Sequence, residues 1–336
     1  MIFENTYSPQ PWTLTSHLSM LTSLYPETHD VREGLTLGHK WQTLAEILKR
    51  NGYATGGFVT SSNWLDNRYG CGRGFDHYWC RDEQGEKVNA AVADFVSKNR
   101  NKPIFLFIHY YDVHSGGRGP DNRLPYHAPE EIRKLFMPDR ARVFTGGDGV
   151  HWSTSYLLHA EEKGIGLNDA ELEELRGLYD SAVRLADTNL CNLFAMLKKE
   201  DVFENSIIII TADHGEELQD HGHFLHFQLY EEVFRVPLII RIPRKPAKAE
   251  PRIKEPQRIP GLVSLVDIFP TALDCLGISY PENQVQGQSL LPVLRGRKSA
   301  HRYVFATEFD LIAKQSRMAV RDESWKLICT GDETPR

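Results

Sequence analysis

Runs of apolar residues predict four strands along the chain. Residues 104–110 and 207–210 carry no polar alternation, which predicts strands buried on both faces. Shorter runs at 57–60 and 236–242 predict two more strands. Each run is flanked by polar or glycine-containing segments, so the strands are expected to be short and well separated along the chain.

Apolar residues at helical spacing predict the helices that separate these strands. The predicted helices span residues 13–24, 39–51, 88–96 and 168–199. The longest has Asn168 as its N-cap and Glu171 three residues later, a variant of the capping box. Because strands and helices alternate, the predicted fold is α/β, with a largely parallel central sheet flanked by helices.

The two ends of the chain and one internal segment depart from this alternation. No apolar strand is predicted before Ser8, where the sequence is polar and contains prolines. Residues 115–165 are rich in Gly, Pro and charge and predict a long, functional excursion. Short β-type runs predict a small antiparallel appendage at the carboxyl end. The expected organisation is an α/β domain over 1–295 and the start of a small subdomain over 296–336.

Composition excludes several classes of protein. The 336 residues carry a net charge of −6 without a long basic run, which disfavours nucleic-acid binding. No stretch is apolar enough to predict a membrane span, and the first residues lack the pattern of a signal peptide. Five cysteines without CxxC spacing favour free thiols in a reducing compartment, which predicts a cytoplasmic protein.

The segment after the four-isoleucine strand carries the strongest chemical signal. It begins with Asp213 and His214 and continues with His221, His223 and His226. Ligands of open α/β sheets bind beyond the carboxyl ends of strands, where Asp213 and His214 are expected. Oxygen and nitrogen donors together suit a divalent cation such as Ca²⁺, Mg²⁺, Mn²⁺ or Zn²⁺. The alternative is a turn-capping Asp among surface histidines.

Other polar residues at element ends offer weaker candidates, and the common phosphate-loop, nucleophile-elbow and HExxH motifs do not occur. Thr13 opens a helix and either caps it or attacks a bound ester. His114 follows a buried strand and acts either as a general acid or as an ordinary loop partner. His109, inside that strand, is interpreted as a hydrogen-bonded core residue, and Asp187 as structural rather than a substrate contact.

These segments together resemble the sulfatase branch of the alkaline phosphatase superfamily. The resemblance follows the order of the family's motifs along nearly the whole chain. The segments that carry it are residues 11–22, 45–53, 74–76, 105–114, 211–216, 229–238, 263–271 and 287–292. It implies a metal-dependent hydrolase of sulfate or phosphate esters that uses one divalent cation (Ca²⁺, or Mn²⁺ or Zn²⁺) and takes a small anionic ester as substrate.

The resemblance also implies roles for individual residues. Thr13 falls at the position of the nucleophile. Thr13, Asp213 and His214 fall at the positions of the metal ligands. His114 and His226 fall on residues that contact the transferred group or the leaving oxygen.

Two further histidines are implied as substrate contacts. His17 stands where the family's nucleophile motif has Arg. The loop before His226 is a residue shorter than usual, so His223 competes for its role.

Three departures from the family pattern matter. Threonine carries a methyl group on Cβ, so Thr13 cannot become formylglycine, and direct attack by its hydroxyl is expected. The family's amino-terminal strand with its metal-binding Asp is absent, since Glu4 is the only acidic residue before Thr13. The chain also ends soon after Cys329, where the carboxyl-terminal subdomain of relatives continues. These departures leave two alternatives open: a phosphodiesterase or phosphonate hydrolase, and an inactive member that binds an anion or a partner.

Overall fold

The structure is a computed structural model. It describes residues 1–116, 124–137, 153–243, 257–297, 301–310 and 315–331. No helix within these ranges is long and apolar enough to cross a membrane.

A mixed four-stranded sheet forms one half of the core. It contains β1 (Ile2–Tyr7), β5 (Ile208–Thr211), β8 (Arg235–Arg241) and β9 (Arg258–Ser264), in the order β5-β8-β1-β9. Strand β8 runs antiparallel to both β5 and β1, and β9 runs parallel to β1. Strand β5 is therefore an edge strand of this sheet.

A parallel three-stranded sheet forms the other half. It contains β2 (Ala54–Val59), β3 (His77–Cys80) and β4 (Ile104–His109), in the order β3-β2-β4. Gly56 and Gly57 in β2 leave room for aromatic rings, since a Cβ at either position would come within 3.0 Å of Phe95 or Tyr78. Strand β4 is an edge strand, as β5 is in the first sheet.

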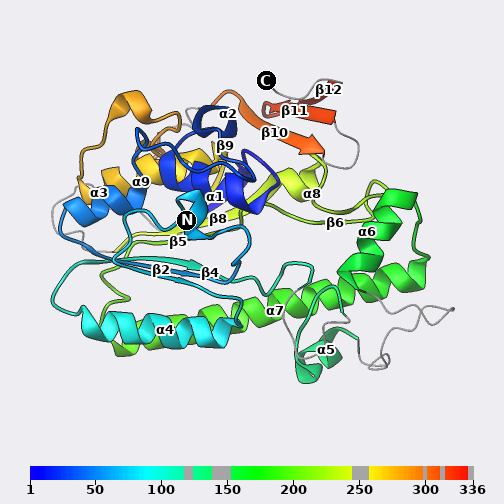
Figure 1. The fold of residues 1–336 in the computed structure, drawn as a ribbon, viewed down its shortest axis with the longest axis horizontal. Helices are drawn as coiled ribbons and strands as arrows, with labels where there is room; N and C mark the ends of the chain where they lie inside the picture. The colour runs from blue at the N-terminus through cyan, green and yellow to red at the C-terminus, as the bar shows by residue number, and fades with distance from the viewer. Residues whose placement is uncertain (117–123, 138–152, 244–256, 298–300, 311–314, 332–336) are drawn as a thin grey trace.

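Helices cover the strands on both sides (Figure 1). On one side lie α1 (Thr13–Thr22), α3 (Leu44–Arg50) and α9 (Ile268–Leu276). On the other side, α4 (Gly85–Lys98) and α7 (Asp169–Lys199) pack their apolar faces on β2 and β4. Helices on both sides fit the lack of polar alternation in β4, but all residues of β4 and β5 are only partly buried, so the predicted full burial on both faces was wrong.

Shorter elements connect these layers. The short helices are α2 (Pro26–His29), α5 (Glu130–Phe136), α6 (Thr154–Lys163), α8 (Glu231–Phe234) and α10 (Leu291–Leu294). The 3₁₀ turns are Asn67–Tyr69, Leu265–Asp267 and Glu282–Gln284, and the two-stranded hairpin is β6 (Glu217–Leu218) with β7 (Phe224–Leu225).

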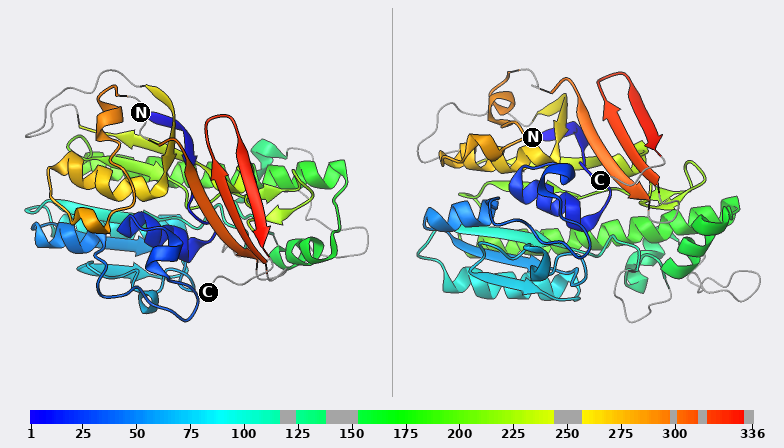
Figure 2. Two further views of the ribbon diagram at one scale, coloured as in Figure 1. Left: turned by 90° about the horizontal axis from the view of Figure 1, so that it is seen from above. Right: turned by 45° about the horizontal axis from the view of Figure 1, so that its top comes forward.

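The carboxyl-terminal strands form a separate antiparallel sheet. It contains β10 (Val304–Asp310), β11 (Gln315–Arg321) and β12 (Lys326–Gly331), drawn from orange to red in Figure 2. Val304 and Ala306 pack against Tyr7 of β1. The predicted appendage is thus confirmed, and it is joined to the main sheets by an apolar contact.

The α/β fold class and the capping box of α7 are confirmed. The Asn168 side chain accepts hydrogen bonds from the amides of Ala170 and Glu171, and the Glu171 carboxylate accepts from the amide of Asn168. The five cysteines are free, as their spacing predicted.

Four other details of the prediction were wrong. A strand, β1, does precede Ser8, because its residues pair with β8 and β9 although their sequence lacks a continuous apolar run. The main strands form two sheets, and the one containing β1 is mixed rather than parallel.

Helix α3 begins at Leu44 rather than near residue 39, because Thr43 and Glu46 form a capping box there. The excursion at 115–165 contains α5 and α6; residues 117–123 and 138–152 lie outside the described ranges.

A buried histidine ties α2 to the helix that begins with Thr13. His29 Nε2 lies 3.1 Å from Ser19 Oγ, and its Nδ1 accepts a hydrogen bond of 3.1 Å from the amide of Val31. Burial lowers the pKa of His29 from 6.5 to about 4. The native state therefore holds the neutral ring and resists its protonation.

We predict that replacing His29 weakens the acid sensitivity of folding. The folded-state pKa lies below the unfolded value, so the contribution of His29 to stability is complete above pH 6.5 and is lost as the pH falls towards 4. The full loss is about 3 kcal/mol. The free energy of unfolding, measured with urea, should fall between pH 7 and pH 4.5 in both proteins. The fall should be smaller in His29→Gln than in the parent chain, by about 2 kcal/mol.

The control is His39→Gln, which removes an exposed histidine. Equal losses of stability in the parent chain and in His29→Gln between the two pH values would contradict the assignment.

Candidate active site

The start of α1 places the predicted nucleophile in a buried position. Thr13 is the first helical residue and is 4% exposed. No side chain caps the helix at Trp12, and no acidic residue lies in its first turn. The Thr13 Oγ1 atom lies 3.4 Å from Nε2 of His214. A hydroxyl at an uncapped helix start is well placed to meet an anion, because free amides and the helix dipole favour negative charge there.

Asp213 follows β5 and is held against this first turn. Its backbone carbonyl accepts a hydrogen bond of 2.8 Å from Ser16 Oγ. Its carboxylate Oδ2 is buried and accepts no hydrogen bond from any described residue. The nearest ring nitrogens are His17 Nδ1 at 3.4 Å and His214 Nε2 at 3.5 Å. A buried carboxylate oxygen without a hydrogen-bond partner fits the role of a cation ligand, because a bound cation would satisfy it.

The surroundings keep Asp213 ionised. Burial acts to raise the pKa of its carboxyl, but His214, His17 and His109 more than offset burial, so the pKa lies well below its ordinary value. The carboxylate therefore offers a full negative charge to a ligand at neutral pH.

Three histidines form a cluster with a shared orientation. Each Nδ1 faces an acceptor outside the cluster. Nδ1 of His114 lies 2.6 Å from the Ser115 carbonyl, and Nδ1 of His214 lies 2.9 Å from the Gly215 carbonyl. Nδ1 of His226 lies 3.2 Å from the Glu216 carboxylate. An Nδ1 that donates a proton outward leaves Nε2 with its lone pair. One ring nitrogen of each residue lies within 4.8 Å of the other two. We infer that the three Nε2 atoms converge.

Ring packing holds this His114–His214–His226 cluster together. The rings of His214 and His226 stack with centroids 4.2 Å apart, and His114 meets His226 edge-on at 5.1 Å. Tyr111 stacks on the other face of His114. Burial, followed by the neighbouring His226, lowers the pKa of His114 to about 4, and burial lowers the pKa of His214. Without a bound anion, His114 is therefore a lone-pair acceptor at neutral pH.

Sequence analysis missed two residues that orient His226. Glu216 is buried, accepts a hydrogen bond of 2.8 Å from the Tyr126 hydroxyl and pairs with Nδ1 of His226. Glu216 stands inside the motif at 211–216, so its position next to Asp213 and His214 was a usable signal. Tyr126 comes from the excursion after β4, and nothing in the sequence links it to this loop.

His109 was also misjudged. It was interpreted as a hydrogen-bonded core residue, but its Nδ1 is buried and has no partner among the described residues. Its ring lies 5.0 Å from that of His17, and burial, followed by His17, lowers its pKa to about 3. His109 is the last residue of β4, and its ring lies beside that of His17. It therefore lines the site.

Two candidates lie apart from the cluster. His223 Nδ1 pairs with Glu161 at 2.8 Å, and its ring has no described contact with His114, His214 or His226. Its substrate role stays a prediction. Asp187 is exposed and pairs with Arg184 of the same helix at 2.8 Å, as its structural interpretation expects.

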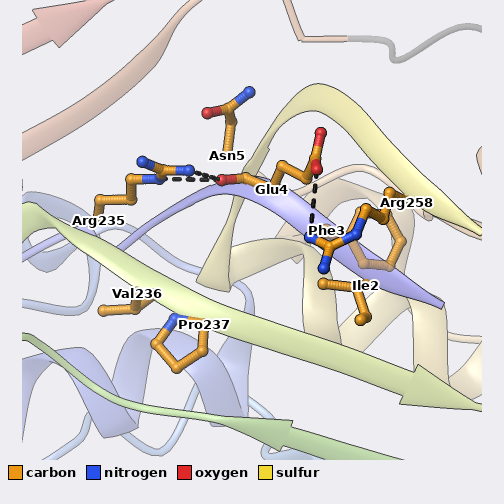
Figure 3. Close-up of a pocket in the computed structure, with 8 residues that line it drawn as sticks. All are labelled: Ile2, Phe3, Glu4, Asn5, Arg235, Val236, Pro237 and Arg258. Carbon is orange, nitrogen blue, oxygen red and sulfur yellow. Dashed lines mark hydrogen bonds and ion pairs between the residues drawn. The ribbon is translucent and has the colours of Figure 1, made fainter.

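A large surface hollow lies elsewhere, between β1, β8 and β9 (Figure 3). It has a volume of about 570 Å³, and none of the predicted site residues lines it. Its polar groups are engaged: Arg235 donates to the backbone carbonyl of Glu4, and Arg258 pairs with the Glu4 carboxylate at 3.4 Å. The hollow therefore lacks the free, convergent groups that a catalytic site requires.

Two donor sets can hold a metal ion, and they share His214. Asp213, His214 and Thr13 offer a carboxylate, an imidazole and a hydroxyl around the unpartnered Oδ2. His114, His214 and His226 offer three imidazoles, a set known from zinc sites. The first set contains the orphaned, ionised oxygen and therefore fits a dication better.

Comparisons with known proteins identify the family of the chain. The family model "Sulfatase" matches residues 1–278. Arylsulfatase K of Rattus norvegicus is 32% identical over 75% of this chain, and the match spans 46% of that protein, about half its length.

Solved structures share the fold. A protein in complex with its substrate D-glucosamine-2-N,6-O-disulfate aligns with a TM-score of 0.71 at 21% identity, covering 97% of this chain and 81% of that one. The phosphonate monoester hydrolase of Silicibacter pomeroyi aligns with a TM-score of 0.68 at 19% identity, covering 98% and 81%.

We predict that Gly215→Ala disrupts the site through the backbone. Gly215 donates to the carbonyl of Val233 at 2.8 Å, and a Cβ at Gly215 would overlap the carbonyl oxygen of Glu232. The loop carrying His214 must then move, at an expected cost of about 2 kcal/mol or more in the free energy of unfolding. Urea denaturation measures this loss.

The matched control is Gly38→Ala, where the nearest atom to the added Cβ lies 3.8 Å away. If both variants unfold at the same urea concentration, the close approach at Gly215 does not constrain the fold.

Proposed function

The chain belongs to the sulfatase family, and on this basis we propose that it is a metal-dependent hydrolase of small, anionic sulfate or phosphate esters. One observation carries the proposal: the Thr13 hydroxyl lies beside His214, next to the unpartnered, ionised oxygen of Asp213. A nucleophile and a cation site at one helix start are the two parts that such hydrolysis requires.

The family generally binds a divalent metal ion, and Asp213, His214 and Thr13 are the residues proposed to hold it here. The bound ion would supply positive charge that polarises a non-bridging oxygen of the ester and favours the ionised Thr13 hydroxyl. An imidazole in the donor set favours Mn²⁺ or Zn²⁺ over Ca²⁺, which prefers oxygen ligands throughout.

The chain's own residues would then divide the reaction into two steps. Thr13 Oγ1 gives up its proton to water and forms a bond to sulfur or phosphorus while the bond to the leaving oxygen breaks. His114 or His226 donates a proton from Nε2 to that oxygen. Water then cleaves the Thr13 ester and restores the hydroxyl. The negative charge of a bound ester raises the pKa of His114 from its low value, so binding itself favours the proton-donating form.

The start of α1 would orient the ester. Its first amides are free of any side-chain cap, and His17 keeps the first turn close to Asp213 by hydrogen bonding the Thr13 carbonyl at 2.7 Å. Amides at a helix N-terminus bind oxyanions. The non-bridging oxygens of the ester are therefore proposed to face these amides.

A phosphonate or phosphate diester is the second candidate substrate class. The observation that favours it is Thr13 itself, since a threonine at the nucleophile position attacks directly and cannot become formylglycine. The fold shared with a phosphonate monoester hydrolase is compatible with this chemistry.

We predict that Thr13→Val abolishes ester hydrolysis. The variant replaces the hydroxyl by a methyl group of similar size, so kcat/KM for nitrophenyl sulfate, phosphate and phosphonate esters should fall at least about a thousandfold. The melting temperature should change little, because within the described part of the chain the hydroxyl makes one long contact, of 3.4 Å with His214.

Thr13→Ser should retain part of the activity, and Thr15→Val provides a control in the same helical turn. Full turnover in Thr13→Val would remove Thr13 as the nucleophile, and an inactive parent chain would favour the anion-binding alternative.

We predict that Asp213→Asn loses about one equivalent of bound Mn²⁺ or Zn²⁺ and all turnover. The amide keeps the size of the carboxylate and removes the charge that the cation needs. Elemental mass spectrometry of the dialysed chain measures the metal, and His226→Asn distinguishes the donor sets. Metal lost from His226→Asn but retained by Asp213→Asn would assign the ion to the three-histidine set instead.

A further inference from the structure

A second group of metal-type ligands lies outside the site described above. Glu217 comes from β6, His221 from the turn after it, and Glu232 from α8. One ligand atom from each lies within 4.8 Å of the other two. We call these three residues the Glu217 cluster.

The backbone fixes the distance between the two segments that carry the Glu217 cluster. The amide of Gly215 donates to the carbonyl of Val233 at 2.8 Å, and the amide of Glu216 donates to the carbonyl of Glu232 at 3.1 Å. These two bonds hold α8 directly against the segment that leads into β6. The convergence of Glu217 and Glu232 is therefore built into the main chain and does not depend on flexible side chains alone.

The cluster contains buried carboxylate oxygens that accept no hydrogen bond within the described residues. The side chain of Glu217 is fully buried, and its Oε2 accepts no hydrogen bond from any described residue. Oε2 of Glu232 is also buried without a hydrogen bond. Nδ1 of His221 makes a hydrogen bond of 2.7 Å with Oε1 of Glu217 and lies 3.5 Å from Oε2 of Glu232. Two buried carboxylate oxygens, one on each Glu, therefore accept no hydrogen bond within the described residues, which is costly for buried groups.

Neighbouring cations pair mainly with Glu231, although Lys326 also interacts electrostatically with Glu232. Lys326 and Arg321 approach the carboxylate of Glu231 at 3.3 and 3.7 Å. The ring of His221 stacks on Tyr230 with centroids 4.0 Å apart, which fixes its orientation. The His221 side chain is 41% exposed, so an ion from solvent can reach the cluster.

We propose that Glu217, His221 and Glu232 form a second divalent-cation site, one that prefers Zn²⁺ or Mn²⁺. Two carboxylates and one imidazole are a donor set suited to these ions, with water completing the coordination. The ion would bind the free oxygens of Glu217 and Glu232 and the Nδ1 lone pair of His221, whose neutral ring then carries its proton on Nε2.

The proposed ion would stabilise the loop of the candidate active site, residues 213–216, on the side that faces away from the histidine cluster. Glu216 and Glu217 are consecutive, and consecutive side chains of an extended segment point to opposite sides. Glu216 contacts His226 of the histidine cluster, whereas Glu217 contacts His221. A cation joining Glu217 to Glu232 would therefore tie β6 to α8 without entering the ester site.

The test measures zinc binding by the full chain without any ester, so its outcome is independent of the proposed hydrolysis. The chain is stripped with a chelator and titrated with Zn²⁺ in the Asp213→Asn background, which removes the ionised ligand of the first site. Calorimetry gives affinity and stoichiometry, and the zinc-dependent rise in melting temperature gives a second readout. The variants are Glu217→Gln, Glu232→Gln and His221→Asn, with Glu231→Gln as the matched control.

The proposal expects one Zn²⁺ per chain in the Asp213→Asn background. Each of the three ligand variants should weaken its binding about 100-fold and abolish the thermal shift, whereas Glu231→Gln should leave both unchanged. His221→Asn keeps the experiment informative if a buried Glu variant fails to fold, because His221 is half exposed. Absence of zinc binding, or binding that the folded ligand variants leave unchanged, would overturn the proposal.

Discussion

The arrangement of the site depends on keeping one carboxylate ionised inside the protein. The Asp213 side chain is partly buried, with its Oδ2 atom inaccessible, and its pKa is lowered because His214, His17 and His109 surround it. Each imidazole comes from a different element: the loop after β5, helix α1 and the end of β4. A buried charge of this kind is unfavourable unless a counter-charge is present. The same environment that favours the ionised form of Asp213 keeps its carboxylate available as a ligand for a cation.

Sequence patterns predicted those elements that depend on residues close together along the chain. The uninterrupted apolar run of β4, the capping box of α7 and the strands of the carboxyl-terminal sheet were found because each depends on a few neighbouring residues. Asp213, His214 and Thr13 were proposed as site residues because each stands at an element boundary, and their roles stay predictions. The structure brings all three together, with His114 and His226 beside them.

The features that sequence analysis missed depend on distant partners. Strand β1 is defined by its pairing with β8 and β9, more than 200 residues away, and its own sequence lacks a continuous apolar run. Glu216 gains its role from Tyr126, a residue of the excursion, through one hydrogen bond. His109 has the sequence context of a core residue, and only the approach of His17 from α1 shows that it faces the site. Pairings across a fold leave no pattern in a single sequence.

Helix α1 therefore does more than present Thr13. Strands β4 and β5 are the edges of two separate sheets, and their ends deliver His109 and Asp213 to the same place. Within the described residues, α1 contacts both ends: Ser16 bonds the Asp213 carbonyl, and His17 lies against His109 and near the Asp213 carboxylate. A displacement of this helix would separate the nucleophile from the cation ligands and the two sheet edges from each other. The position of α1 thus couples the geometry of the site to the way in which the two sheets are held together.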